Sequence, residues 1–129
     1  MRIDHVMFRT TDLDGSISFY HDVFGLELIS VDNRMGNDVK YITAFMGVDG
    51  PQGFKIELTF NPEELNLSPG NTVDHLAIYV DDSGKIHNAL AGIVDFEVTK
   101  HQYGDKTYTF TKFKSPEGIN LVAIEKVVL

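Results

Sequence analysis

Cysteine is absent from the 129 residues of this chain, which excludes disulfides, thiolate metal ligands and a thiol nucleophile. Basic residues are scarce as well. Eleven Lys and Arg residues stand against nineteen Asp and Glu residues, for a formal net charge of −8. An acidic chain without a basic stripe is not expected to bind nucleic acid or an anionic membrane.

Long apolar runs are also missing, since no stretch approaches the roughly 20 residues that a membrane helix needs. The first residues, MRIDH, do not resemble a signal peptide. Together with the lack of cysteine, this predicts a cytoplasmic protein. Apolar residues make up 43% of the chain and charged residues 23%, as in folded globular proteins. The length suits one domain with a core, but not two independent ones.

The first half of the chain predicts the order strand, helix, strand, strand, strand. The first strand covers residues 3–9, and the helix covers 16–24, between cap residues at 11–14 and Gly25. The remaining strands are expected at 26–31, 39–46 and 54–60. A polar turn at 32–38 joins the first two of these.

The same order begins again after a linker at 62–71, which contains two prolines and one glycine. A strand is expected at 73–80, and a helix from Asp81 and Asp82 to about Ala91, ended by Gly92. Three more strands are expected at 94–99, 107–113 and 119–127. We therefore predict a single α+β domain of two βαβββ modules, about 1–61 and 72–129, whose curved mixed sheets form one cleft.

The repeat is visible in residues as well as in element order. Asp4-His5-Val6 opens the first half, and Asp74-His75-Leu76 opens the second. The closing strands correspond too, since the segment GFKIE at 53–57 aligns with GINLV at 118–122. This alignment places Glu57 opposite Val122 in the repeat.

Three side chains of the predicted strands could bind a metal ion together. Side chains alternate across a strand, so Glu57 would lie opposite the apolar residues at 56, 58 and 60, which are expected to pack under a helix. Glu57 would then face the cleft with His5 and His75, and such a set suits Zn²⁺, Ni²⁺, Fe²⁺ or Mn²⁺. Taken singly, each residue has a simpler interpretation. His5 could be a surface histidine, His75 a hydrogen-bonded core histidine, and Glu57 a solvated carboxylate.

The other three histidines are interpreted as solvated residues without partners in helix or turn contexts. They are His21, His87 and His101.

Four segments resemble glyoxalase I, the lactoylglutathione lyase family. They are HVMFRTTDLDGSISFYHDVFGLEL at 5–28, IELTFN at 56–61, Asp74 to Asp81 and SPEG at 115–118. That family belongs to the vicinal oxygen chelate superfamily, which also holds bleomycin-resistance proteins, fosfomycin-resistance enzymes and extradiol dioxygenases. The resemblance implies the fold of paired βαβββ modules, a homodimer with metal sites at the subunit interface, and a small-molecule substrate.

Glyoxalase I isomerises the hemithioacetal of glutathione and methylglyoxal. Its divalent metal binds both substrate oxygens and stabilises an enediolate, while a carboxylate shuttles the proton between two carbons. The resemblance assigns His5, Glu57 and His75 as metal ligands, with Ni or Zn expected and Fe or Mn as alternatives. It makes Glu57 the catalytic base as well. Arg9 and Asn61 match residues that bind the glutamyl end of glutathione.

The chain departs from the family at the fourth metal ligand, a glutamate whose position is Val122 here. Glu125 lies three residues farther on and would point to the opposite face of a regular strand, so it could substitute only through a β-bulge. That fourth glutamate is also a principal proton shuttle in the family. Weak or absent lyase activity is therefore expected.

Two other functions remain open at this point. One is a different metalloenzyme of the superfamily, although the dioxygenases and fosfomycin enzymes take their carboxylate from the closing strand, which lacks it here. The other is a non-catalytic protein that sequesters a small molecule, as bleomycin-resistance proteins do.

Overall fold

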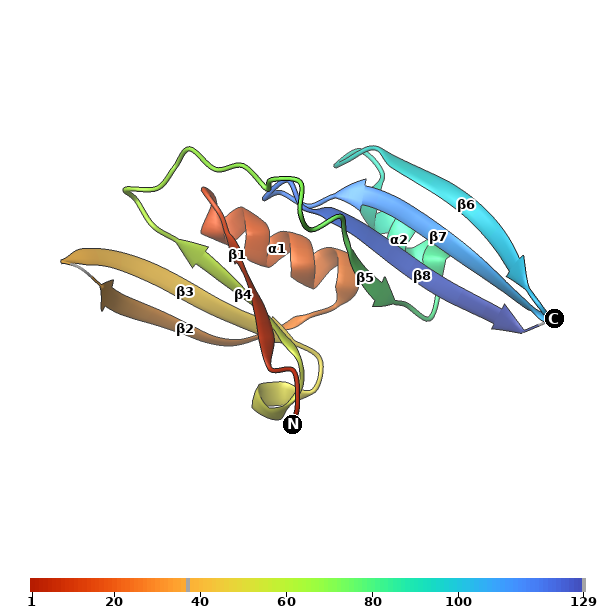
Figure 1. Ribbon diagram of the computed structural model, residues 1–129, viewed down its shortest axis with the longest axis horizontal. Coiled ribbons are helices and arrows are strands. Elements are labelled where there is room, and N and C mark those ends of the chain that lie inside the picture. The colour runs from red at the N-terminus through yellow and green to blue at the C-terminus, as the bar shows by residue number, and fades with distance from the viewer. Residues whose placement is uncertain (37, 129) are drawn as a thin grey trace. The chain divides into compact units, whose positions relative to one another are not determined.

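The computed structural model describes residues 1–36 and 38–128. The chain divides into two compact units, Met1–Ser68 and Pro69–Leu129. Each unit has one four-stranded sheet with one α-helix against it (Figure 1). Whether the two units make a single domain stays a prediction.

The first unit follows the predicted order. Its elements are β1 (His5–Arg9), α1 (Leu13–Phe24), β2 (Glu27–Gly36), β3 (Val39–Gly47), the 3₁₀ helix η1 (Gly50–Gln52) and β4 (Lys55–Phe60). The sheet order is β1-β4-β3-β2. Strands β1 and β4 are parallel, and the other pairs are antiparallel.

The second unit repeats this topology. Its elements are β5 (Leu76–Tyr79), α2 (Ser83–Leu90), β6 (Phe96–Tyr103), β7 (Lys106–Lys114) and β8 (Asn120–Val128). The sheet order is β5-β8-β7-β6, with β5 and β8 parallel. The predicted α+β class and the repeated βαβββ order are thus confirmed.

Helix α1 has the caps that the sequence predicts. The carboxylate of Asp12 accepts a hydrogen bond from the Gly15 amide at 3.0 Å, which satisfies one of the first orphan N–H groups. Gly25 ends the helix at a φ of 69°, a conformation in which a Cβ is strained. The inward face buries Phe19, Tyr20 and Val23.

The strand faces follow the predicted alternation in both units. In β4, Ile56 and Leu58 are buried, while Glu57 between them is only half-buried. In β8, Leu121 and Ala123 are buried on the side of α2. The apolar face of each closing strand therefore packs under a helix, which leaves the other face for a site.

Two strands extend well beyond their predicted ends. Strand β2 continues to Gly36 instead of ending at Val31, and pairs with β3 as far as Val39. Of the polar residues placed in a turn, Asn33 and Arg34 are exposed and Asp32 is partly exposed on this edge strand, where backbone pairing outweighs weak strand propensity. Asn37 of the same predicted turn lies outside the described residues. Strand β6 likewise runs to Tyr103, four residues past its predicted end.

Candidate metal centre

Glu57 is held in place by two hydroxyl groups. Thr43 on β3 donates to its Oε2 at 2.6 Å, and Thr59 on β4 donates to the same oxygen at 3.3 Å. The side chain is 16% exposed, so most of it is shielded from water. These bonds fix the carboxylate and direct its other oxygen, Oε1, toward His5.

His5 and Glu57 meet as two predicted metal ligands. The His5 Nε2 atom lies 3.2 Å from Glu57 Oε1. Two ligand atoms on one ion, each bonded at about 2.1 Å, stand about 3.0 Å apart at a right angle and about 3.4 Å apart at a tetrahedral angle. The observed separation falls between these values.

The orientation of His5 is set by Asp4. The Asp4 Oδ2 atom lies 2.7 Å from His5 Nδ1, and because a carboxylate only accepts, Nδ1 is the donor. The Nε2 atom of a neutral His5 then carries a lone pair and faces a carboxylate oxygen. A metal ion bound by both atoms would fit this separation. A carboxylate behind a ligating histidine is the usual support in metal sites.

Asp4 is itself strongly stabilised as an anion. The hydrogen bond to His5 lowers the pKa of Asp4 to about 2, with a further contribution from the ammonium of Lys55 at 3.1 Å. Lys55 is buried and also donates to the carbonyls of Pro51 and Gly53. Asp4 therefore joins the turn before β4 to the candidate ligand.

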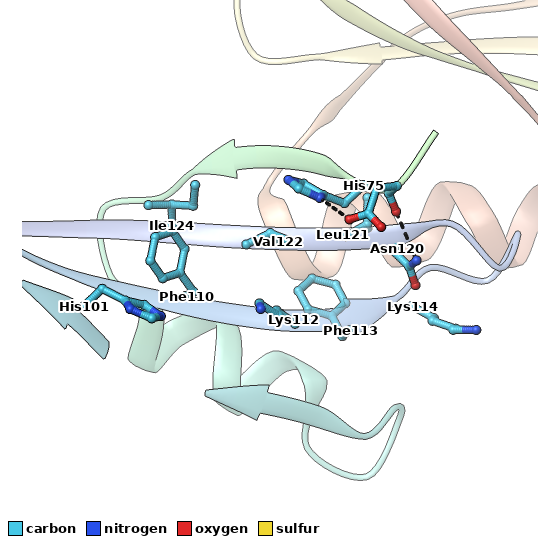
Figure 2. Close-up of a pocket in the computed structure, with 11 residues that line it drawn as sticks. His75, His101, Phe110, Lys112, Phe113, Lys114, Asn120, Leu121, Val122 and Ile124 are labelled. Atoms are coloured by element: carbon cyan, nitrogen blue, oxygen red, sulfur yellow. Dashed lines mark hydrogen bonds and ion pairs between the residues drawn. The ribbon is translucent and has the colours of Figure 1, made fainter. Parts of the chain in front are cut away.

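His75 has the same local arrangement in the second unit. Its Nδ1 atom lies 2.7 Å from Asp74 Oδ2, and 46% of its side chain is exposed. The main-chain carbonyl of Asp74 accepts a hydrogen bond from the side-chain amide of Asn120 (Figure 2). His75 was expected inside a strand, but it directly precedes β5, which begins at Leu76. The pairing of β5 with β8 also begins at Leu76, so His75 lies just outside it.

The structure does not assemble a complete ligand set. Over residues 1–36 and 38–128, no three or more His, Asp or Glu side chains gather into a metal-binding group. His5 and Glu57 belong to the first unit and His75 to the second. Of the three predicted ligands, His5 and Glu57 lie close together in the first unit, and their role as ligands stays a prediction.

The strand register identifies the counterpart of Glu57 directly. Glu57 pairs with Met7 on its parallel neighbour, and Val122 pairs with Ala77 at the equivalent position. Glu125 does not replace the missing carboxylate. The β7–β8 register continues without a bulge, and Glu125 accepts hydrogen bonds from the amide and hydroxyl of Ser83, at the start of α2. It lies on the helix side of the sheet, as expected for a regular strand.

Comparison with known proteins identifies the family. The model of the Glyoxalase/Bleomycin resistance protein/Dioxygenase superfamily matches residues 2–122. The chain belongs to this superfamily.

Its curated relatives are of the lyase branch. The probable lactoylglutathione lyase of Vibrio cholerae is 37% identical over 128 residues, which cover 96% of this chain and 90% of that protein. The lactoylglutathione lyase of Haemophilus influenzae is 35% identical, with 97% and 93% covered. The trypanothione-dependent glyoxalase I of Leishmania major superposes with a TM-score of 0.78 at 23% identity, over 97% and 86% of the two chains, and supports the fold.

The two residues that are predicted to bind substrate, Arg9 and Asn61, already contact other residues of the first unit. The guanidinium of Arg9 forms an ion pair with Glu64. The side-chain oxygen of Asn61 accepts a hydrogen bond from the Glu63 amide at 2.9 Å. The two residues lie at neighbouring strand ends, because Arg9 pairs with Thr59. The sequence did not predict a role for Glu64. Its only signal is the acidic pair of residues 63 and 64 near the start of the linker.

The interpretation of the remaining histidines as partnerless is wrong. His87 Nε2 lies 2.8 Å from Thr111 Oγ1, and its ring stacks on Phe96. His101 lies in β6 and packs edge-on against Phe110. His21 is exposed but lies 3.0 Å from the Asp22 carboxylate. The contacts of His87 and His101 depend on how α2, β6 and β7 pack together, which periodicity does not reveal, whereas that of His21 is with its neighbour in the sequence.

A pocket of about 490 Å³ lies on the face of the second sheet that carries Val122. We call it the second-unit pocket, since all of its lining comes from that unit. Figure 2 shows the side chains around it. They are Asp74, His75, His101, Phe110, Lys112, Phe113, Lys114, Asn120, Leu121, Val122 and Ile124.

Proposed function

We propose that this chain is a glyoxalase I-type metalloprotein that acts on the hemithioacetal of a 2-oxoaldehyde and a thiol such as glutathione, with turnover limited by Val122. The curated relatives, which are lactoylglutathione lyases, support the reaction class. The observation that carries the proposal is the approach of His5 Nε2 to Glu57 Oε1, with each side chain held from behind by its own partner.

These residues fit a borderline divalent ion. An imidazole nitrogen and a carboxylate oxygen suit Ni²⁺ or Zn²⁺, with Fe²⁺ or Mn²⁺ as the other candidates. When bound, such an ion would supply Lewis-acid stabilisation of negative charge on the substrate oxygens. We assign His75 as the third ligand, and its Asp74 contact prepares it in the way that Asp4 prepares His5.

The protein residues would divide the remaining work. Glu57 is the base that moves the proton between adjacent carbons, and it has no carboxylate partner at Val122. Arg9 and Asn61 would bind the carboxylate end of the thiol. Since Glu64 pairs with Nη1 of Arg9, we expect the substrate carboxylate to compete with Glu64 for the guanidinium. Binding thus exchanges one exposed ion pair for another, so the net gain is small.

We also propose a homodimer, as the family resemblance implies. The described residues include no helix that is long and apolar enough to cross a membrane. A cytoplasmic location remains our proposal from composition. Sedimentation velocity would test the oligomer: a monomer at tens of micromolar would contradict it.

Metal affinity tests the proposed site. Protein purified without chelator should bind one Ni²⁺ or Zn²⁺ per chain, and His5→Gln, Glu57→Gln and His75→Gln should each weaken binding at least tenfold. His21→Gln is the matched control, because His21 also has a neighbouring carboxylate but lies on the exposed face of α1, away from the proposed ligands. Binding should weaken as pH falls, since a proton competes for Nε2. Equal affinity in all four variants would contradict the site.

Activity tests the reaction. Thioester formation from methylglyoxal and glutathione should be slow in the wild type with Ni²⁺ or Zn²⁺, and undetectable in Glu57→Gln. Robust wild-type turnover would show that Val122 does not limit catalysis. Turnover that persists in Glu57→Gln would contradict its assignment as the base.

A second function, sequestration without catalysis, is favoured by one observation. The second-unit pocket is lined by apolar groups where the family places its fourth ligand, and Val122 is 7% exposed there. Stoichiometric metal with no thioester formation from any 2-oxoaldehyde would favour a diverged metalloprotein. Absence of metal together with tight binding of a small molecule would favour sequestration.

A further inference from the structure

The two halves of the repeat differ at more than Glu57 and Val122. Because Phe45 pairs with Glu57 and Lys112 pairs with Val122, Lys112 stands at the repeat position of Phe45. In the first unit, Phe45 packs edge-on against His5 at 5.5 Å. The second unit therefore carries a lysine where the first carries an aromatic support for a candidate ligand.

The hydroxyl groups that hold Glu57 are also replaced. Thr43 pairs with Thr59 in the first unit, and Phe110 pairs with Ile124 at the equivalent place. The position of the missing carboxylate and these three neighbouring positions, four in all, thus differ between the halves. Three are apolar in the second unit, and the fourth is a cation.

The charge of the second-unit pocket is opposite to that of the chain. Its lining includes Lys112 and Lys114 but only one carboxylate, Asp74, which is hydrogen-bonded to His75. In Figure 2, Lys114 extends away from the other labelled side chains, whereas Lys112 lies on the strand beside Val122. Among the described residues, the Lys112 ammonium has no hydrogen bond or ion pair.

We propose that the second-unit pocket binds an organic carboxylate, with Lys112 as the anion-binding residue and Phe110, Val122 and Ile124 as the apolar wall for its body. An ammonium pairs with a carboxylate as a point charge, and the apolar wall gains by removing the hydrocarbon part from water. The volume, about 490 Å³, accommodates a small aromatic acid. All of these residues lie in one unit, and none of them is one of the three proposed metal ligands, although His75 also lines the pocket.

A matched pair of probes separates charge from shape. Phenylacetate and phenylacetamide are nearly isosteric, and only the former is an anion. Calorimetric titration of the full chain at pH 7 and low salt, with and without EDTA, should give about three- to tenfold tighter binding of phenylacetate. Lys112→Gln should remove this preference. Lys85→Gln, on the exposed face of α2 and outside the pocket, should keep it.

Location and folding are checked in the same samples. Phenylacetate should shift the NMR resonances of His75 and His101 in the wild type, and far-UV circular dichroism should show that Lys112→Gln is folded. Equal affinities for acid and amide would overturn the proposal, as would an unchanged preference in Lys112→Gln. A preference that appears only with Ni²⁺ present would assign the anion to the metal instead. Unchanged metal affinity in His5→Gln with the preference retained would leave this inference standing while the metal centre falls.

Discussion

Restoring the missing carboxylate is the most direct test of how the second half differs from the first. Val122→Glu alone places a carboxylate at a position that is 7% exposed, between Phe110 and Ile124 instead of two threonines. A buried polar group without adequate hydrogen bonds costs about 1–3 kcal/mol. We expect Val122→Glu to lower the free energy of unfolding by that amount in metal-free protein.

Lys112 determines what the new carboxylate can do. Residues directly opposite on antiparallel strands have Cβ atoms about 4.5–5.5 Å apart, so the ammonium can pair with Glu at 122. It also repels a divalent ion. At a separation of about 7 Å in a water-like dielectric, the repulsion is about 1 kcal/mol, or roughly fivefold in Kd. Adding Lys112→Phe removes both the ion pair and the repulsion. Phenylalanine is the residue at the equivalent position of the first unit, Phe45.

The expected order of Ni²⁺ affinity is therefore wild type, then Val122→Glu, then Val122→Glu with Lys112→Phe as the tightest. Competition with a chromophoric chelator measures it, and thioester formation should increase in the same order. The control is the double variant Val122→Gln with Lys112→Phe, since glutamine has nearly the shape of glutamate but carries no charge. If this control binds Ni²⁺ as tightly as the glutamate variant, or if Lys112→Phe adds nothing to Val122→Glu, the electrostatic reasoning is wrong.

Three further perturbations probe the first unit. The pKa of Asp4 is held at about 2, mainly by His5, so its stabilisation is complete above its ordinary pKa of 3.8 and is lost as pH falls toward 2. Asp4→Asn should flatten this part of the pH profile in urea unfolding, and an unchanged slope would contradict the assignment. Replacing Thr43 and Thr59 together with Val should weaken metal binding about tenfold, whereas unchanged titrations would show that the hydroxyl groups do not orient Glu57. Gly25→Ala should cost about 1–2 kcal/mol in chemical denaturation because of the positive φ, with Gly25→Asn milder.

Local sequence signals were sufficient for the repeat, the helix caps and the faces of the closing strands. Asp12 and Gly25 act within a few residues of their own positions, and alternation in IELTF placed Ile56 and Leu58 in the core. Such features depend on short-range geometry, so they can be predicted from one sequence.

Contacts between distant strands could not be predicted in the same way. The hydroxyl of Thr43 holds Glu57 only because β3 and β4 pair in one register, and the ion pair of Arg9 with Glu64 depends on the path of the linker. The replacement of an aromatic residue by Lys112 could have been predicted from the sequence. Had the alignment of the halves been extended one strand back, TAFM at 43–46 would have faced FTKF at 110–113, with Phe45 against Lys112.

The alternation of faces along β4 and β8 has a consequence for how such a protein can change over generations. In each strand the residues under the helix are buried in the core, and the intervening position carries Glu57 in one half and Val122 in the other. Glu57 and Val122 occupy equivalent places in two sheets of the same strand order, so this fold accommodates either residue there. A duplicated module therefore permits a new ligand preference to arise in one half while the other half retains the older chemistry.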